Sequence, residues 1–375
     1  MKRIMIICSV ALLALLVSTN VNAAAPAKKH LGIATYSVKG LESNIEGAFK
    51  SLQEAGYVTM EISNYNAGTG MVAGYKPADY AALAEKYGMD IISSHARAAF
   101  NVNDVPGTVA AWAKLFDDHK AMGCKYVVFP MNTSWSSKVE GLKAECDLMN
   151  KIGEEANKRG IKFGYHNHNM EFATIPGTSQ MYEDFLIANT DPSKVFFQLD
   201  VYWASVGGVN PAEYIKKHAD RIKVLHIKDD YVIGESGTID YKAIFEQFYK
   251  NGYEDWFVEM EAKMTPEQKA QSLDRMKAMQ KAMSEGTSSN PFGAPQGGQQ
   301  GARPQGQGQP GQAQAQGQPQ QGQQGAQRPQ GQGQQQGAPM GPRQQDPAVV
   351  AEQLKTSLEG IKASADYLLK AEFVK

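Results

Sequence analysis

The sequence predicts an α/β fold, a (β/α)8 TIM barrel that forms one large domain over residues 31–286. Eight short apolar runs recur along the chain with starts about 26 to 36 residues apart, and helical patterns fill the gaps between them. No glycine-rich phosphate turn follows the first run, which argues against a doubly wound sheet. With 42% hydrophobic residues among 375, the chain has ample material for a core.

The apolar runs have the length of buried parallel strands, whose sequences are nearly continuous apolar segments. The predicted strands cover 31–35, 57–62, 90–94, 126–130, 161–166, 195–200, 222–227 and 256–261. The predicted helices cover 43–55, 77–87, 107–122, 138–159, 179–188, 211–219 and 240–251. Pro77 and Pro211 stand at first helical turns, where proline is tolerated. Glycine directly follows four of the helices, as expected for αβ loops, at Gly56, Gly88, Gly123 and Gly160.

The regular pattern breaks after the eighth strand. Residues 265–284 form a charged helical pattern with Leu273, Met276, Met279 and Met283 on one face, which is typical of a packing or partner surface. Residues 287–345 are almost entirely Gly, Gln, Pro and Ala, so we expect a disordered insertion. Residues 346–375 resume the helical pattern and are predicted to complete the barrel as its last helix.

The N-terminus predicts a secretory signal peptide over residues 1–23. A basic start is followed by an apolar stretch and a small-residue cleavage site near Ala23. The apolar stretch is shorter than the ~20 residues of a membrane span, although an uncleaved anchor is the alternative. We therefore expect a periplasmic or secreted protein with no membrane span after cleavage. Cys124 and Cys146 could then pair or remain two buried thiols.

The charge balance excludes two classes of partner. The formal net charge is -1, with acidic and basic residues interspersed, so there is no basic surface for nucleic acid or anionic lipid. A small-molecule ligand is favoured, and a homo-oligomer remains open.

Polar residues stand at the ends of six predicted strands. Since catalytic groups of a TIM barrel come from the carboxyl ends of its strands, these side chains can converge on one mouth. A single one would usually be a cap or a loop anchor, but six together indicate a site. They are Glu61, His95, His166 with His168, Asp200, His226 and Glu259.

Asp200, His226 and Glu259, supplemented from the fifth strand, form a mixed oxygen and nitrogen set. Such a set suits a divalent metal ion, Mn²⁺, Mg²⁺, Co²⁺ or Zn²⁺. An ion there could polarise a carbonyl while a nearby carboxylate or imidazole moves a proton. The implied chemistry is proton abstraction next to a sugar carbonyl. Aromatic residues that could stack on a sugar ring follow the strands at Tyr36, Trp135, Tyr165, Tyr202 and Trp203.

Motifs on four strands carry a resemblance to a known family. They are Tyr-His-Asn-His at 165–168 with Glu171, Leu-Asp-Val-Tyr-Trp at 199–203, His-Ile-Lys-Asp at 226–229 and Phe-Val-Glu-Met-Glu at 257–261. The chain resembles the xylose isomerase-like TIM-barrel superfamily, in particular its sugar phosphate isomerase/epimerase group. That resemblance implies that Asp200, His226 and Glu259 are metal ligands.

The fifth strand departs from the family pattern. Epimerases of the superfamily supply a glutamate there that binds metal and transfers a proton, whereas this chain has His166 and His168. The histidine-rich strand is similar to that of inosose dehydratases and of secreted enzymes that act on 3-keto-glycosides. It raises the alternative of β-elimination in place of epimerisation.

We therefore predict a secreted, metal-dependent enzyme of the sugar isomerase/epimerase type that acts on a non-phosphorylated sugar or keto-sugar. The alternatives are a lyase or dehydratase acting on a keto-sugar or 3-keto-glycoside, and a non-catalytic carbohydrate-binding barrel. The predicted metal ligands are Asp200, His226, Glu259 and His168, with His166 as the other candidate on its strand. The predicted catalytic residues are Glu259, His166, His168 and Lys228. The predicted substrate contacts are Glu61, His95, Tyr165, Trp203 and Glu171.

Overall fold

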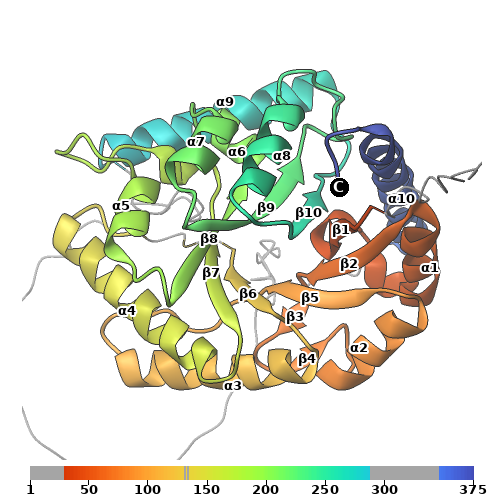
Figure 1. Ribbon diagram of the computed structural model, residues 1–375, viewed down its shortest axis with the longest axis horizontal. Coiled ribbons are helices and arrows are strands. Elements are labelled where there is room, and N and C mark those ends of the chain that lie inside the picture. Colours follow the sequence, from red (N-terminus) through yellow and green to blue (C-terminus); the bar gives the residue numbers. More distant parts are fainter. Residues whose placement is uncertain (1–28, 131, 133–134, 288–345) are drawn as a thin grey trace, which may run out of the picture.

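A closed parallel barrel of eight strands forms the centre of the molecule, as Figure 1 shows for the computed structural model. The structure describes residues 29–130, 132, 135–287 and 346–375. Around the barrel the strand order is β1-β10-β9-β8-β7-β6-β5-β2, and every neighbouring pair is parallel. The predicted (β/α)8 barrel is confirmed.

The strands lie where the apolar runs predict them. The barrel strands are β1 (Leu31–Ala34), β2 (Tyr57–Ile62), β5 (Asp90–His95), β6 (Tyr126–Phe129), β7 (Lys162–His166), β8 (Val195–Asp200), β9 (Ile222–Lys228) and β10 (Trp256–Glu259). The α-helices are α1 (Ile45–Ala55), α2 (Pro77–Lys86), α3 (Val105–Ala121), α4 (Val139–Asn157), α5 (Tyr182–Asn189), α6 (Val201–Val206), α7 (Pro211–Lys217), α8 (Tyr241–Lys250), α9 (Pro266–Ser284) and α10 (Pro347–Lys370).

Local sequence signals set the helix ends. Asn210 and Asp240 accept hydrogen bonds from backbone amides of the first turns of α7 and α8, which satisfies donors that have no partner inside a helix. Pro77 and Pro211 occupy first turns as predicted. Gly56 ends α1 with φ at 99°, a left-handed conformation that favours glycine.

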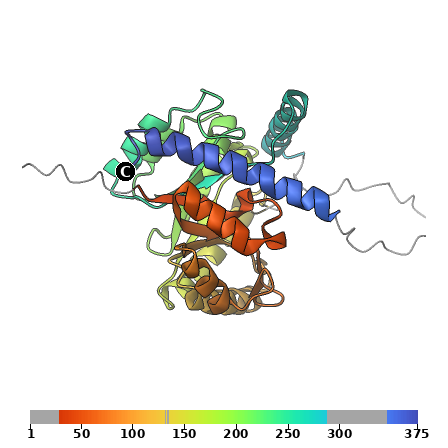
Figure 2. The same ribbon diagram turned by 90° about the vertical axis from the view of Figure 1, so that its right-hand side faces the viewer.

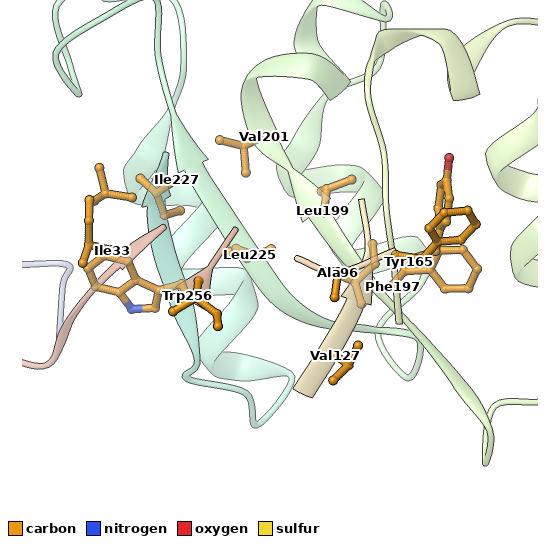
Figure 3. Close-up of a cluster of buried hydrophobic side chains, with 14 of the residues drawn as sticks. Ile33, Ala96, Val127, Tyr165, Phe197, Leu199, Val201, Leu225, Ile227 and Trp256 are labelled. Atoms are coloured by element: carbon orange, nitrogen blue, oxygen red, sulfur yellow. The ribbon is translucent and has the colours of Figure 1, made fainter. Parts of the chain in front are cut away.

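The core has two separate parts because strand side chains alternate between the two faces of the barrel wall. The larger part lies between the strands and the surrounding helices, and Figure 3 shows members such as Ile33, Phe197 and Leu225. The smaller part fills the barrel interior and consists of Ala34, Val128, Phe196, Val224 and Phe257. The polar residues at the carboxyl ends of the strands form the next layer above this apolar interior plug.

Gly164 on β7 makes room for the interior plug. A Cβ atom at this position would lie 2.5 Å from the ring of Phe196, far closer than carbon atoms approach one another. The absence of a side chain on β7 therefore lets the phenylalanine of β8 fill the barrel.

The last helix, α10, closes the ring of helices although a long stretch of sequence separates it from β10. It packs against α1, next to which it lies in Figure 1. The hydroxyl of Tyr57 donates to the carbonyl of Ile361 at 3.0 Å, and Lys29 donates to the carbonyl of Leu368 at 3.3 Å. These contacts tie α10 to the start of the barrel.

Three features were not predicted. A small antiparallel pair, β3 (Tyr65–Asn66) and β4 (Met71–Val72), follows β2, and 3₁₀ turns occupy Thr35–Ser37, Leu41–Ser43 and Asn169–Phe172. Helix α6 begins directly after β8. Of the two alternatives predicted for Cys124 and Cys146, the structure shows free, buried thiols and not a pair.

Two predictions fall on other parts of the chain. The signal peptide at 1–23 and all but the first residue of the segment 287–345 lie outside the described residues. Within the described ranges, no helix combines the length and the apolar character needed to cross a membrane.

Candidate active site

A cavity of about 580 Å³ opens at the carboxyl ends of the barrel strands. Its polar side is formed by side chains from the strand ends, and helix α9 contributes a second side. The lining residues from the strands and their loops include Tyr36, His95, His166, His168, Trp203, Glu259 and Glu261, and those from α9 are Lys269, Ser272, Leu273 and Met276. This is the position of the active site in TIM-barrel enzymes.

Four buried side chains form a candidate metal site at the cavity floor, which His166 and Glu259 line, and directly beneath it. One potential ligand atom from each of His166, Asp200, His226 and Glu259 lies within 4.8 Å of the others. They come from the ends of β7, β8, β9 and β10, four neighbouring strands. Their side chains are at most 5% exposed, so water supplies little of their solvation.

The imidazole of His226 is held from both sides. Its Nε2 lies 2.6 Å from Oε1 of Glu61 and donates a hydrogen bond to it. Its Nδ1 lies 3.0 Å from Oε2 of Glu259, but the two atoms are not aligned as a hydrogen bond. Two ligand atoms that approach without pointing at each other are arranged as they would be around a shared cation.

Asp200 supplies a second orphaned atom. Its Oδ1 accepts a hydrogen bond of 2.9 Å from the backbone amide of Trp203, which caps α6. Its Oδ2 is buried and has no hydrogen-bond partner among the described residues. Because an unpaired buried carboxylate oxygen is costly, this atom fits a metal ligand better than a structural role. The oxygen and nitrogen donors suit Mn²⁺, Mg²⁺, Co²⁺ or Zn²⁺.

The protonation of the cluster follows from its charges. Burial lowers the pKa of His226, but the carboxylates of Glu61 and Glu259 outweigh burial and raise it to about 10. Burial raises the pKa of Asp200 to about 7. Burial raises the pKa of Glu259 too, yet Lys228 and His226 hold it well below its usual range. The cluster therefore attracts a positive charge, which protons supply in the absence of an ion.

A layer of hydrogen bonds beneath the cluster orients its histidines. Glu61 is fully buried and accepts from Ser93 Oγ at 2.7 Å and from Gln198 Nε2 at 2.8 Å, and His95 Nε2 lies 3.0 Å from its Oε1. The side-chain oxygen of Gln198 lies 2.7 Å from His95 Nε2 and 3.0 Å from His166 Nδ1. Such contacts fix the tautomers and ring orientations of metal-binding histidines.

Gln198 is a site residue that we did not predict. The sequence indicated its position, because Gln198 lies two residues before Asp200 and therefore on the same face of the strand. Glu61, a predicted substrate contact, lies below the cavity and is not among its lining residues, since protein donors surround its carboxylate. His95, also a predicted contact, does line the cavity.

Lys228 lies between two carboxylates. Its Nζ is 2.7 Å from Glu259 Oε1 and 2.7 Å from Glu261 Oε1, and 5.0 Å from the centre of the Trp203 ring. Burial lowers the pKa of Lys228, but the two carboxylates outweigh burial and raise it well above its usual range. The lysine is a fixed positive charge that keeps Glu259 ionised.

His168 lies outside the four-residue cluster but lines the cavity. The structure thus places His166, and not the predicted metal ligand His168, among the candidate ligands. Burial and the nearby charge of Lys228 lower the pKa of His168 to about 3, so its ring is neutral. Its Nδ1 has no hydrogen-bond partner in the described part of the chain, and the same holds for Nε1 of the adjacent Trp203. Both groups can meet a bound ligand.

Besides Glu61, two more predicted substrate contacts, Tyr165 and Glu171, are not brought into the cavity. Tyr165 precedes His166 and therefore points to the outer face of the barrel wall, where Figure 3 shows it among buried apolar side chains. Its hydroxyl donates to Glu171 Oε1 at 2.5 Å, and Glu171 in turn accepts from the backbone amide of His168 at 2.8 Å. These residues support the loop that follows β7.

The fold and the site define a TIM-barrel enzyme with a His/Asp/Glu cluster at the carboxyl-terminal mouth. A family model described as xylose isomerase-like TIM barrel matches residues 49–281, which is more than half of the chain. The chain belongs to this family.

Solved structures with high overall similarity come from Parabacteroides distasonis ATCC 8503. Two sugar phosphate isomerases/epimerases of this organism match with 25% and 28% identity and TM-scores of 0.66 and 0.65. The matches cover 94% and 92% of this chain and 100% of each neighbour. The predicted resemblance to the sugar phosphate isomerase/epimerase family is confirmed.

Curated relatives in sequence are inosose dehydratases. The enzyme of Geobacillus kaustophilus (strain HTA426) is 25% identical over 264 residues, which are 57% of this chain and 79% of the relative. That of Clostridium beijerinckii is 29% identical over 150 residues, 34% of this chain and about half, 49%, of the relative. The proteins similar to this chain are thus isomerases, epimerases and dehydratases. The prediction of an enzyme of the sugar isomerase/epimerase type, with a lyase or dehydratase also possible, is confirmed.

Proposed function

We propose that this protein is a metal-dependent enzyme that removes the proton next to the carbonyl of a non-phosphorylated sugar. The observation that carries the proposal is the buried cluster of His166, Asp200, His226 and Glu259, which contains a carboxylate oxygen and an imidazole nitrogen without hydrogen-bond partners. Non-catalytic sugar binding would not require such a costly arrangement. A bound divalent ion would supply Lewis acidity toward a substrate oxygen.

The chain itself provides a proton acceptor. His168 lines the cavity with a neutral ring and an unpartnered Nδ1, so it is placed to accept a proton, while burial and Lys228 keep its pKa low and the ring a weak base. Trp203 Nε1 is a free donor beside it and can orient a substrate hydroxyl. Glu259, held ionised by Lys228, is suited to remain a ligand rather than to exchange protons.

The fate of the carbanion decides between isomerisation and elimination. Elimination is the second candidate, and a specific observation favours it. Epimerisation needs acid/base groups on both faces of one carbon. In the described cavity His168 is a base outside the ligand cluster, whereas Glu259 is a candidate ligand that also accepts a hydrogen bond from Lys228. The inosose dehydratases among the relatives are consistent with loss of a β-substituent.

Two further parts of the proposal rest on the sequence. The basic and apolar N-terminus supports export to the periplasm or beyond the cell. Since sugar phosphates are metabolites of the cell interior, an exported enzyme would meet free sugars, keto-sugars or glycosides.

Solvent exchange tests the proposed chemistry without assuming its outcome. The metal content of protein purified without chelator is measured first, and a panel of keto-sugars, including 3-keto-glucosides, is then incubated with the enzyme in D₂O. We expect about one divalent ion per chain and deuterium next to the carbonyl, both lost in Asp200→Ala. A product that retains every substituent and differs in mass only by the incorporated deuterium would indicate isomerisation, and loss of a substituent would indicate elimination. Sugar binding without metal and without exchange would establish a binding barrel instead.

A further inference from the structure

Helix α9 lies along one side of the barrel mouth, at the upper edge of the molecule in Figure 1, and lines that side of the cavity. Figure 2 shows it at one end of the molecule, the end at which α10 begins. Of its residues only Met283 is buried, and with Met279 it packs against the main core, so core packing holds the carboxyl-terminal end of the helix alone. The helix nevertheless has defined attachments on two sides.

The carboxyl-terminal half of α9 is hydrogen-bonded to the loops of the mouth. Asn169 donates to the carbonyl of Met276 at 3.1 Å, and Gln280 donates to the carbonyl of Gly207 at 3.1 Å. At its other half, Lys269 forms an ion pair with Asp230, which follows β9. The helix therefore runs along one side of the mouth, from the β7 loop to the β9 loop.

The side of α9 that faces the cavity is mainly apolar. Leu273 and Met276 line the cavity, and so does Met264, which precedes the helix. Met264 is among the few large apolar side chains left exposed in the described part of the chain. Exposed apolar groups that gather in a ligand pocket mark a contact surface for something apolar.

Aromatic side chains from the opposite loops line the same cavity. The hydroxyl of Tyr36 is engaged by Glu261 at 3.0 Å, and that of Tyr65 by Asp118 at 2.6 Å. Because the protein engages both hydroxyls, these residues offer ring surface rather than polar groups, and at Tyr36 the ammonium group of Lys39 covers one ring face at 3.4 Å from the ring centre. We call the set Tyr36, Tyr65, Tyr202, Met264, Leu273 and Met276 the outer subsite.

The cavity thus has a polar floor and an apolar entrance. Its volume of about 580 Å³ falls in the range of about 300–1,000 Å³ that encloses drug-sized ligands, and a single sugar ring is smaller than these. A sugar bound at the floor would leave the outer subsite free for another group.

We propose that the outer subsite binds a ring substituent attached to the sugar, so that the substrate is a glycoside with an aromatic or otherwise largely apolar second group. This inference rests on the proposed function, because it needs the sugar to occupy the floor of the cavity. It assigns to α9 the recognition of the substituent, and it separates that role from the chemistry at the floor.

Calorimetric binding to the metal-loaded full-length protein tests the assignment with three probes: 3-keto-glucose, its methyl glycoside and its phenyl glycoside. We expect the phenyl glycoside to bind about tenfold or more tightly than the methyl glycoside, since burial of a phenyl ring contributes at least that factor. Leu273→Ser should reduce this ratio to about threefold or less and leave the affinity for the free sugar unchanged. Met276→Ser should act in the same direction.

Arg275→Ser, on the exposed side of the same helix, is the matched control and should retain the wild-type ratio. Equal affinities of wild type for the methyl and phenyl glycosides, or a phenyl preference that survives in the Leu273→Ser/Met276→Ser double variant, would overturn the outer subsite while leaving the proposed function intact. Failure of all three sugars to bind a protein that has taken up metal would instead overturn the proposed keto-sugar substrate and this inference with it.

Discussion

Glu61 and His226 form a buried pair in which Nε2 of the imidazole donates a 2.6 Å hydrogen bond to Oε1 of the carboxylate. The pair joins β2 to β9 across the barrel interior, below the candidate metal site. It directs Nδ1 toward Asp200 and Glu259 and increases the basicity of the ring, as partners of metal-binding histidines commonly do.

Glu61→Gln should therefore weaken metal binding without removing a ligand. We expect the affinity to fall by about 10–100-fold, the usual effect of losing such a partner. Competition with a chelator of known affinity measures it. Glu183→Gln, at a buried glutamate of α5 that lies outside the metal cluster, is the control and should bind metal like wild type. An affinity of Glu61→Gln within twofold of wild type would show that the pair does not support a metal ligand.

The two histidines after β7 should respond differently to substitution. His166→Gln removes a member of the ligand cluster, and we expect metal content and solvent exchange to fall together. His168→Gln leaves the cluster intact, so metal content should remain near wild type while proton exchange falls by about 100-fold or more, as for a lost general base. Metal analysis and deuterium incorporation on the same preparations separate the two. If His168→Gln loses as much metal as His166→Gln, His168 is a ligand.

The difference between these histidines shows where sequence reasoning stops. Alternation along a strand places His166 and His168 on one face, but β7 ends at His166. The next residue, Asn167, uses its side chain to accept the amide of Asp200 at 3.0 Å, and this contact replaces a regular strand ladder. Alternation no longer applies to His168, and its position follows from the loop.

Within the strands, the sequence was sufficient to predict the fold and the direction in which the polar side chains point. The eight apolar runs and the alternation along them predicted the barrel, and they predicted that Glu61, His226 and Glu259 point into it. The same rule also shows that Tyr165 must point away, because it neighbours His166. We predicted Tyr165 as a sugar contact because it is aromatic, without considering which face of the strand its side chain is on.

Helix α9 could not be placed from its own pattern. The stripe of Leu273, Met276, Met279 and Met283 predicted a packing or partner surface, and the structure divides that stripe. Leu273 and Met276 line the cavity, while Met283 is buried. Which part of an amphipathic face meets protein and which meets a ligand depends on distant loops, such as the one that carries Asp230.

Lys228→Met should destabilise the fold. The substitution leaves Glu259 and Glu261 close together without their shared cation, and breaking a buried ion pair in this way costs about 3–5 kcal/mol. Denaturant unfolding of the metal-free protein at neutral pH measures the loss. Adding Glu261→Gln removes one of the two charges and should restore part of the stability. A loss below about 1 kcal/mol for the single variant would contradict a buried, paired lysine.

Glu145 of α4 provides a pH-dependent test outside the active site. Burial raises the pKa of its carboxyl group to about 7, although its carboxylate accepts a hydrogen bond from the amide of Ser136 at 3.2 Å. A carboxyl group with a raised pKa in the fold is stabilising as the neutral acid. Its contribution is fully present below the unfolded-state pKa and is lost as pH rises through about 7.

Glu145→Gln keeps the acceptor for Ser136 but cannot ionise. We expect the variant and wild type to have equal free energies of unfolding near pH 4, and the variant to be more stable by up to about 3 kcal/mol at pH 8. Denaturant titrations of both proteins at a series of pH values give the difference. Glu140→Gln, on an exposed position of the same helix, controls for loss of a negative charge and should show no such trend. A stability difference for Glu145→Gln that stays constant from pH 4 to pH 8 would mean that this carboxyl group titrates alike in the folded and unfolded chains.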